Sequence, residues 1–163
     1  MDEVPALTIV VPARDEEENV GPLVGEVEAA LLSRGVALEL VVVDDGSRDG
    51  TSARLGALAA SRPWLRPLRL DAPSGKSAAL RAGILAARAE LVATMDADLQ
   101  DDPADLLPML ALLERGEADF VQGTRVRRAD GTLRGASAAV GRVARRIALG
   151  DATRDTGGGL RAM

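Results

Sequence analysis

The chain has no cysteine and no histidine among its 163 residues. Without cysteine there are no disulfide bonds and no thiolate ligands, and without histidine the commonest general base and the commonest transition-metal ligand are both absent. Aromatic residues are also scarce, since Trp64 and Phe120 stand alone and there is no tyrosine. Any chemistry must therefore use carboxylates, lysine and arginine. The core must be built from leucine, valine, isoleucine and alanine packed at interior density.

Long hydrophobic runs are missing as well. No apolar stretch in the sequence approaches the roughly 18–20 residues that a membrane-spanning helix needs. The N-terminus lacks the basic and then apolar layout of a signal peptide. We therefore expect a cytoplasmic chain, either soluble or at the cytoplasmic face of the membrane. The net charge of -5 argues against general nucleic-acid binding, which usually requires a basic surface.

Apolar residues make up 47% of the chain and charged residues 28%. At this length, one hydrophobic core and one domain are the default. We expect a single domain over residues 1–163.

Hydrophobic patterning predicts strands that alternate with helices. Short apolar or β-branched runs predict buried strands, and periodic segments with capping residues predict helices. This alternation is typical of an α/β fold with a mostly parallel sheet, helices on both faces and a Rossmann-like layout. The expected strands are 7–11, 38–43, 65–70, 91–95 and 119–122, and the expected helices are 16–34, 51–60, 77–89 and 102–114, with Asp49 or Thr51 and Asp102 as caps.

Polar clusters follow the first, second and fourth of these strands, at 14–19, 44–49 and 96–102. In open parallel sheets, ligands bind beyond the carboxyl ends of the strands. Three acidic clusters at that edge therefore indicate a binding site.

Asp96, Asp98 and Gln100 come directly after the fourth strand. If the segment stays extended, alternate side chains point the same way and the three can converge. Hard oxygen ligands of this kind suit Mg²⁺ or Mn²⁺, which complete their coordination with water and substrate phosphates. The competing interpretation is a solvated loop that caps the next helix. The position after a buried strand favours the metal site.

Two turns carry further candidates. Asp44, Asp45 and Gly46 form a tight turn in which Gly46 permits a positive φ and an acid can bind a base or ribose; a simple strand-to-helix turn is the alternative. Lys76 lies at a helix start and could meet a phosphate, or be a surface lysine. A P-loop is excluded because Leu70 stands where that motif needs glycine.

The segment 125–146 is rich in arginine and indicates an anionic partner. Arg125 and Arg134 could hold phosphate oxygens with their guanidinium forks, or be solvated loop charges. A helix over 138–148 would have an apolar face and an arginine face. It could lie on an anionic membrane or dock on the sheet.

Four motifs in order, PARDE at 12–16, DDGSRDGT at 44–51, GKSAALRAG at 75–83 and DADLQDDP at 96–103, resemble those of family 2 glycosyltransferases with the A-type fold. The polyprenyl- or dolichyl-phosphate sugar synthase branch is the most similar. GTR at 123–125 and the DTGGGLRAM ending extend the resemblance. Members of this branch usually continue beyond the last motif, so we expect residues 1–163 to lack a C-terminal continuation.

The resemblance implies a role for each matched position. Asp45 would hold the base, Asp96, Asp98 and Gln100 would bind Mn²⁺ or Mg²⁺, and Arg125 and Arg134 would grip the acceptor phosphate. The implied catalytic residues are Asp98, Arg125 and Arg134. The implied nucleotide-binding set is Pro12, Ala13, Arg14, Glu16, Asp45, Lys76, Asp96 and Ala97.

The implied reaction is inverting transfer of a sugar from a GDP- or UDP-sugar to a polyprenyl or dolichyl phosphate, with the metal stabilising the leaving diphosphate. Such an acceptor is already anionic, so no strong general base is required. Two alternatives stay open. One is a sugar nucleotidyltransferase, which should have a glycine-rich phosphate loop after the first strand. The other is a non-catalytic nucleotide-binding fragment.

Overall fold

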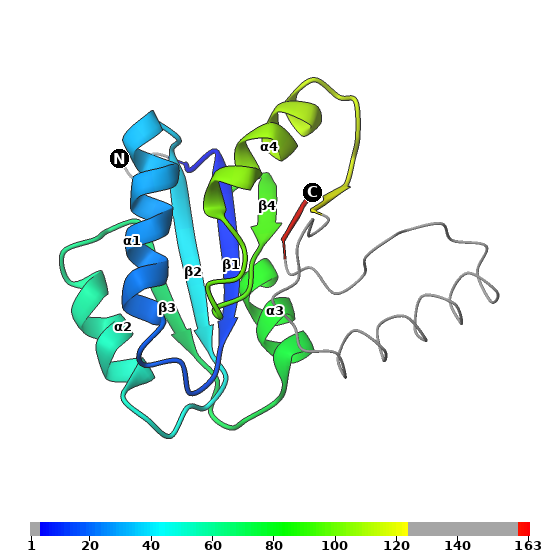
Figure 1. Cartoon of the computed structure of the whole chain (residues 1–163). Helices are drawn as coiled ribbons and strands as arrows, with labels where there is room; N and C mark the ends of the chain where they lie inside the picture. Colours follow the sequence, from blue (N-terminus) through cyan, green and yellow to red (C-terminus); the bar gives the residue numbers. More distant parts are fainter. Residues whose placement is uncertain (1–3, 124–159) are drawn as a thin grey trace, which may run out of the picture.

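A computed structural model describes residues 4–123 and 160–163 of the chain. The described part is an α/β domain around a six-stranded sheet of order β3-β2-β1-β4-β6-β5 (Figure 1). The strands are β1 (Leu7–Ala13), β2 (Leu38–Asp44), β3 (Leu65–Arg69), β4 (Leu91–Thr94), β5 (Val121–Gln122) and β6 (Arg161–Ala162). The helices are α1 (Val20–Ala30), α2 (Thr51–Ala59), α3 (Lys76–Leu85) and α4 (Leu106–Glu114), with short 3₁₀ turns at Leu32–Arg34 and Pro103–Asp105.

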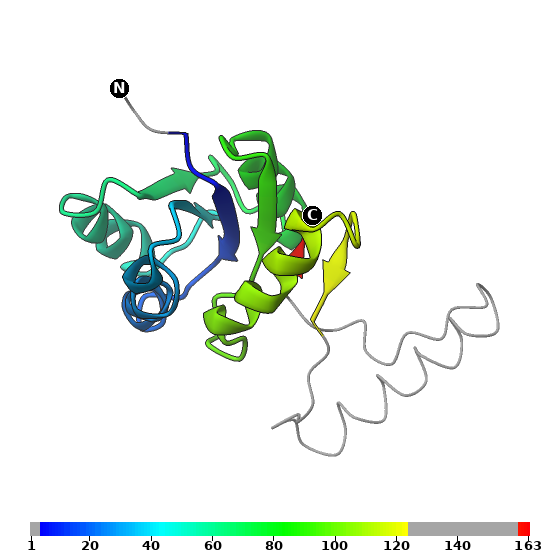
Figure 2. The same ribbon diagram turned by 90° about the horizontal axis from the view of Figure 1, so that it is seen from above.

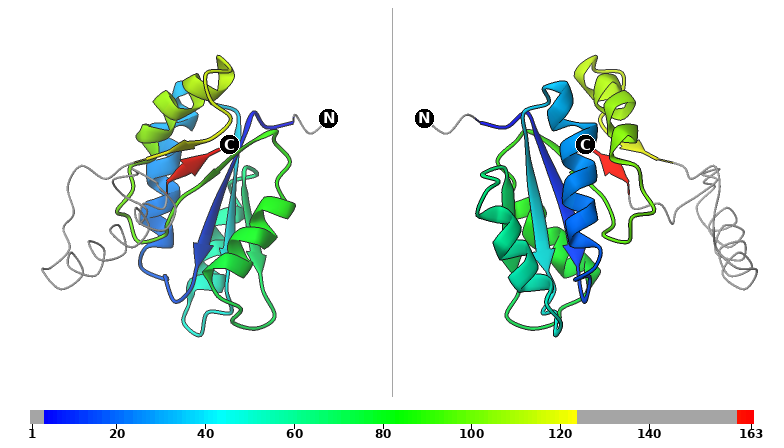
Figure 3. Two further views of the ribbon diagram at one scale, coloured as in Figure 1. Left: turned by 90° about the vertical axis from the view of Figure 1, so that its right-hand side faces the viewer. Right: turned by 60° about the vertical axis from the view of Figure 1, so that its left-hand side comes forward.

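The sheet is mostly parallel, as the sequence predicts. β1 pairs in parallel with β2 on one side and β4 on the other, and β3 pairs in parallel with β2. β6 was not expected. It runs antiparallel between β4 and β5, which Figure 3 shows near the C-terminus. Two residues are too few for any hydrophobic period to be visible in the sequence.

Helices cover both faces of the sheet (Figure 2). Ile9 and Val11 of β1 pack in the large core with Leu23 and Val27 of α1, and that core also contains residues of α2 and α4. Val10, between them, points the other way and packs with Ala79 of α3. Since successive side chains of a strand alternate between faces, a fully buried strand such as β1 is apolar throughout.

Helix α3 lies close to the sheet because Gly83 has no side chain. A Cβ atom at this position would overlap Val10 Cγ1 and lie 3.0 Å from Val43 Cγ2. Gly83 therefore fixes how near α3 lies to β1 and β2. This matters for function because α3 begins at Lys76, at the edge of the sheet where polar clusters gather.

The first helix begins later than the pattern predicts. The helical period starts at 16, but α1 begins at Val20. The backbone N–H groups of Glu16 and Glu17 donate instead to Thr51 Oγ1 at 2.9 Å and Asp49 Oδ2 at 3.2 Å. The first N–H groups of a helix have no partner within it, so these bonds hold the segment from outside. Asn19 N and Val20 N both donate to Glu16 O at 3.0 Å, so residues 16–19 form a turn that leads into α1.

Helix α3 ends earlier than expected, at Leu85 rather than 89. The N–H of Arg88 donates to Glu39 Oε1 at 2.7 Å, and the N–H of Ala89 donates to Thr8 Oγ1 at 3.1 Å. Because these N–H groups bond to buried side chains of β1 and β2 and not to helix carbonyls, the helix ends and the chain continues into β4.

The predicted cap at Asp102 is confirmed, because its carboxylate accepts a hydrogen bond from Ala104 N at 2.9 Å. Asp49 accepts the N–H of Thr51 at 3.0 Å, although Gly50 occupies the cap position of α2. Within the described ranges, none of the helices has both the length and the apolar character that crossing a bilayer requires. The expected helix over 138–148 lies outside the described residues.

Candidate nucleotide and metal site

The site begins where β1 and β4 separate. β1 pairs with β4 only from Leu7 to Val10, whereas its pairing with β2 continues to Ala13. Pro12 falls in this last stretch, where its missing N–H costs no bond to β4. Because β1 lies between β2 and β4, this gap is the switch point of the sheet, which is where ligands bind in such folds.

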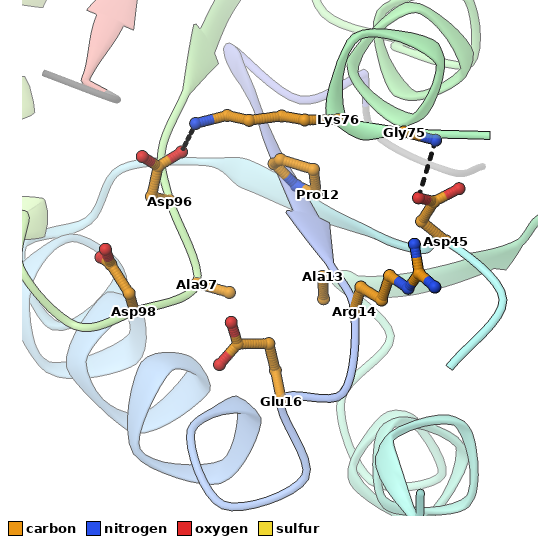
Figure 4. Close-up of a pocket in the computed structure, with 10 residues that line it drawn as sticks. All are labelled: Pro12, Ala13, Arg14, Glu16, Asp45, Gly75, Lys76, Asp96, Ala97 and Asp98. Carbon is orange, nitrogen blue, oxygen red and sulfur yellow. Dashed lines mark hydrogen bonds and ion pairs between the residues drawn. The ribbon is translucent and has the colours of Figure 1, made fainter. Parts of the chain in front are cut away.

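A pocket with a cavity volume of about 340 Å³ opens at this point (Figure 4). That volume lies at the small end of the range for small-molecule sites. Its walls come from the segments that follow β1, β2 and β4 and from the start of α3. The lining residues are Pro12, Ala13, Arg14, Glu16, Asp45, Gly75, Lys76, Asp96, Ala97 and Asp98.

This lining brings together every described residue that the resemblance assigns to the nucleotide. It adds Gly75, which the sequence reasoning missed although the helix start at Lys76 pointed to it. Gln100 is the one described metal candidate that lies elsewhere. Arg125 and Arg134, assigned to the acceptor phosphate, lie outside the described residues and stay predictions.

Gln100 is separated from Asp98 by a bend. Leu99 has a left-handed backbone with φ of 59°, which is uncommon for a bulky residue, and the Gln100 N–H turns back to Asp98 Oδ1 at 3.2 Å. The expected extended segment with three converging side chains is therefore wrong. Gln100 lines a different hollow, against α1, together with Leu99 and Asp101. Of the three metal candidates, Asp96 and Asp98 line the pocket and Gln100 does not.

Asp45 organises the pocket from β2. Its carboxylate is buried and accepts hydrogen bonds from Ser74 N at 2.6 Å and Gly75 N at 2.9 Å. Gly46 has the positive φ that the turn was predicted to need, at 67°. These bonds hold the loop before α3 and so fix the position of the Lys76 backbone.

Lys76 reaches across the pocket to the opposite wall. Its Nζ lies 2.6 Å from Oδ1 of Asp96, at the end of β4. Figure 4 shows Asp96, Ala97 and Asp98 along the segment after β4, with the Glu16 side chain near Ala97. The lining therefore carries two cations, Arg14 and Lys76, against the carboxylates of Glu16, Asp45, Asp96 and Asp98.

The loops after β1 and β2 are locked together. Asp15 has a left-handed backbone with φ of 55°, and its N–H donates to Ser47 Oγ at 2.9 Å. Its carboxylate accepts the N–H of Arg48 at 2.8 Å. Hydrogen bonds from the Thr51 hydroxyl and N–H lower the pKa of Asp49 and keep it a carboxylate. The two loops thus form one rigid wall of the pocket.

The adjacent acids of the second motif have different tasks. Asp44 turns away from the pocket, where its carboxylate accepts Ser47 N at 2.7 Å and Arg69 Nη1 at 2.8 Å. It is almost fully buried. Asp44 therefore closes the turn, and only Asp45 faces the pocket. Nothing in the sequence distinguishes the two.

The pocket suits a hard divalent cation that shares its coordination with a ligand. Asp96 and Asp98 supply carboxylate oxygens, and Mg²⁺ is usually bound by one or two carboxylates plus substrate phosphates and water. In the part of the chain that the structure describes, no group of three or more acids is placed to hold a metal ion unaided. The donor set therefore fits a cation that binds together with a diphosphate.

The fold agrees with the comparisons. Residues 8–162 match the family described as Glycosyl transferase family 2. The chain is 45% identical over 126 residues to a dodecaprenyl-phosphate galacturonate synthase of Rhizobium johnstonii, which covers 77% of this chain and 37% of that protein. It is 36% identical over 158 residues to an undecaprenyl-phosphate 4-deoxy-4-formamido-L-arabinose transferase of Pseudomonas aeruginosa, covering 96% of this chain and 46% of that protein. The chain thus spans less than half the length of these relatives.

A similar solved structure is the mannosyltransferase PcManGT from Pyrobaculum calidifontis, in complex with GDP-mannose and Mn²⁺. It superposes with a TM-score of 0.70 at 28% identity, covering 99% of this chain and 45% of that one. The expected A-type glycosyltransferase fold is thereby confirmed. With the family match over nearly its whole length, the chain belongs to glycosyltransferase family 2.

Proposed function

We propose that this chain is the catalytic domain of an inverting glycosyltransferase that moves a sugar from a nucleoside-diphosphate sugar to a polyprenyl phosphate. The observation that carries the proposal is the pocket at the β1–β4 switch point, which Asp96 and Asp98 line together with Arg14 and Lys76. Carboxylates for a cation and cations for phosphate oxygens are the two requirements for holding a diphosphate.

In this proposal the nucleotide lies against the segments after β1 and β2. Pro12, Ala13, Arg14 and Glu16 supply one wall, and Asp45 limits the depth of the pocket where the base would lie. Arg14 has a half-exposed side chain whose Nε lies 3.9 Å from Asp15 Oδ2, and an exposed pair of this kind is weak enough for the arginine to turn toward a phosphate. Ala97 is buried between the two acids and provides a small contact surface there.

The diphosphate end lies toward β4. Asp96 and Asp98 would hold Mn²⁺ or Mg²⁺, which would supply positive charge to the departing nucleoside diphosphate. In the reaction, an acceptor phosphate oxygen forms a bond to the anomeric carbon while the bond from that carbon to the diphosphate breaks. The bonding electron pair leaves with the diphosphate. Because the acceptor oxygen attacks from the face opposite the leaving group, the anomeric configuration inverts.

The acceptor needs little activation from the protein. A phosphate monoester is anionic at neutral pH and can attack without a strong general base, so a site built without histidine suffices. Arg125 and Arg134 would hold this phosphate. The relatives are named for dodecaprenyl phosphate and undecaprenyl phosphate, which supports a lipid phosphate as the acceptor.

The test is calorimetric titration of GDP and UDP, each with and without Mn²⁺, followed by transfer from the matching nucleotide sugars to undecaprenyl phosphate. We expect one nucleotide to bind only with the metal and its sugar to be transferred. Asp98→Asn should abolish metal-dependent binding with the fold intact. The matched control is Asp105→Asn, an exposed acid outside the pocket, which should bind as the wild type does.

Unchanged nucleotide affinity in Asp98→Asn would remove the metal assignment. Binding without any transfer would favour the alternative of a non-catalytic nucleotide-binding fragment.

A further inference from the structure

We propose that Lys76 is the resident counter-ion of Asp96, which competes with the divalent cation for that carboxylate and is exchanged for it when the nucleoside diphosphate arrives. This inference rests on the proposed function, because it concerns the same pocket. It adds a regulation of metal binding to that function. In the pocket without nucleotide, the Lys76 ammonium group lowers the affinity for the free metal ion.

The geometry places the ammonium where the metal would bind. Nζ of Lys76 lies 2.6 Å from Asp96 Oδ1. A magnesium ion ligated by the same oxygen would lie about 2.1 Å from it. Two cations on one carboxylate repel each other, so metal binding at Asp96 weakens its pair with Lys76, and the pair in turn weakens metal binding.

The two partners differ in their freedom to move. The Asp96 side chain is only 18% exposed and comes directly after β4, which is embedded in the sheet, whereas the Lys76 side chain is 57% exposed. Lysine has a flexible four-carbon stem that keeps its ammonium in reach of several positions. The lysine is therefore the partner that moves when the pair separates.

The backbone under Lys76 stays fixed during such an exchange. Asp45 holds Ser74 N and Gly75 N, and the first turn of α3 is closed by Ala79 N donating to Gly75 O at 3.1 Å. Only the side chain needs to turn. Because it starts at the N-terminus of α3 and lines the pocket, the released ammonium stays beside the diphosphate and contributes to its binding.

Charge explains why exchange is favourable only with the nucleotide. Without ligand, Lys76 partly neutralises the acidic lining. A bare divalent ion would have to displace this cation and leave it unpaired in the pocket. A metal bound to a diphosphate brings new anionic oxygens to which the lysine can transfer. The metal and the nucleotide should therefore bind cooperatively.

The experiment measures binding of Mn²⁺ alone, from the loss of the electron paramagnetic resonance signal of aqueous Mn²⁺. The proteins are wild type, Lys76→Met, Lys76→Arg and Arg81→Met. Arg81 is the matched control, since it is an exposed cation on the same helix outside the pocket and its loss changes the net charge equally. Exposed ion pairs contribute little, so we expect Lys76→Met to bind Mn²⁺ roughly two- to fivefold more tightly. Lys76→Arg and Arg81→Met should stay near the wild-type value.

A second readout is the coupling between metal and nucleotide. In the wild type, the nucleoside diphosphate should increase the affinity for Mn²⁺ by a factor that is smaller in Lys76→Met and unchanged in Arg81→Met. Circular dichroism of each variant confirms that the fold is retained.

Two failures are distinguishable. If Lys76→Met binds Mn²⁺ no more tightly than Arg81→Met while the wild type still transfers sugar, the counter-ion role is wrong and the proposed function stands. If no variant binds Mn²⁺ and wild-type nucleotide binding is independent of metal, the metal assignment of the proposed function fails and the inference fails with it.

Discussion

The carboxylate of Asp45 accepts the backbone N–H of Gly75 at 2.9 Å, which joins the end of β2 to the start of α3 across 30 positions of the chain. The resemblance assigns Asp45 to the nucleotide base, yet its two oxygens are already engaged, the other by Ser74 N. Asp45 therefore also determines where Lys76 begins. Its contribution to binding includes this positioning of α3.

Replacing Asp45 with asparagine tests that role. The asparagine amide has one acceptor oxygen, and its NH₂ group would oppose the backbone N–H of either Ser74 or Gly75. At least one hydrogen bond is therefore lost, which should lower the free energy of unfolding by about 1–3 kcal/mol. Urea unfolding should show this loss, and nucleoside diphosphate affinity should fall with it. The control is Asp71→Asn, an exposed acid in the loop between β3 and α3, which should change neither the stability nor the nucleotide affinity. Weaker nucleotide binding at full stability would instead mean that Asp45 contacts only the nucleotide.

Glu39 predicts a specific pH dependence of stability. Burial by itself would raise the pKa of Glu39, but hydrogen bonds from Arg66, Thr8 and Arg88 outweigh it and lower the pKa to about 2. The ordinary value is 4.5, so this carboxylate favours the native state by about 3 kcal/mol. Because the pKa is depressed on folding, the contribution is complete above pH 4.5 and is lost as the pH falls toward 2.

The measurement compares urea unfolding of wild type and Glu39→Gln at neutral pH and at several acidic values. The difference in unfolding free energy should be largest at neutral pH and should shrink as the pH falls below 4.5. Glu28→Gln, which loses only an exposed contact to Arg62, should cost well under about 1 kcal/mol. A difference that stays constant down to acidic pH would contradict the depressed pKa.

Two glycines in helices should respond in opposite directions to alanine. At Gly83 an added Cβ atom overlaps Val10 on the sheet, so Gly83→Ala should destabilise the fold by about 1–3 kcal/mol. At Gly56 of α2 nothing lies within 4 Å of the added atom. Gly56→Ala should therefore stabilise by up to about 1 kcal/mol, since alanine is the better helix former.

Thermal unfolding of both variants measures these effects. Gly83→Ala should also weaken nucleoside diphosphate binding, because moving α3 shifts Gly75 and Lys76 in the lining of the pocket. Equal stability changes for the two glycines would show that α3 packs less closely on β1 than the structure has it.

The main elements of the fold were predictable because burial leaves a simple signature. β1 and β2 are covered on both faces, so they are apolar at almost every position, and α1 shows its buried stripe at Val20, Leu23, Val24 and Val27. Asp102 and Pro103 mark a helix start by local chemistry alone. The short β6 carries no such signature, because its two residues gain their place only from β4 and β5.

Element ends were less predictable because distant bonds decide them. Residues 16–19 follow the helical period but form a turn before α1, and Thr51 and Asp49 hold this turn to the loop after β2. α3 stops where Arg88 and Ala89 bind Glu39 and Thr8. Local pattern gives the existence of a helix, whereas its ends depend on partners elsewhere in the chain.

The sequence by itself determined the α/β class, the family motifs and the acids available at the sheet edge, because each depends on residue type and spacing along the chain. The tertiary structure decided how those residues are used. The turn at Leu99 separates Gln100 from Asp98, and Asp44 faces Arg69 while its neighbour Asp45 faces α3. The pairing of Lys76 with Asp96 joins residues 20 positions apart. Such contacts depend on backbone direction and on which strands lie side by side, and the packed sheet fixes both.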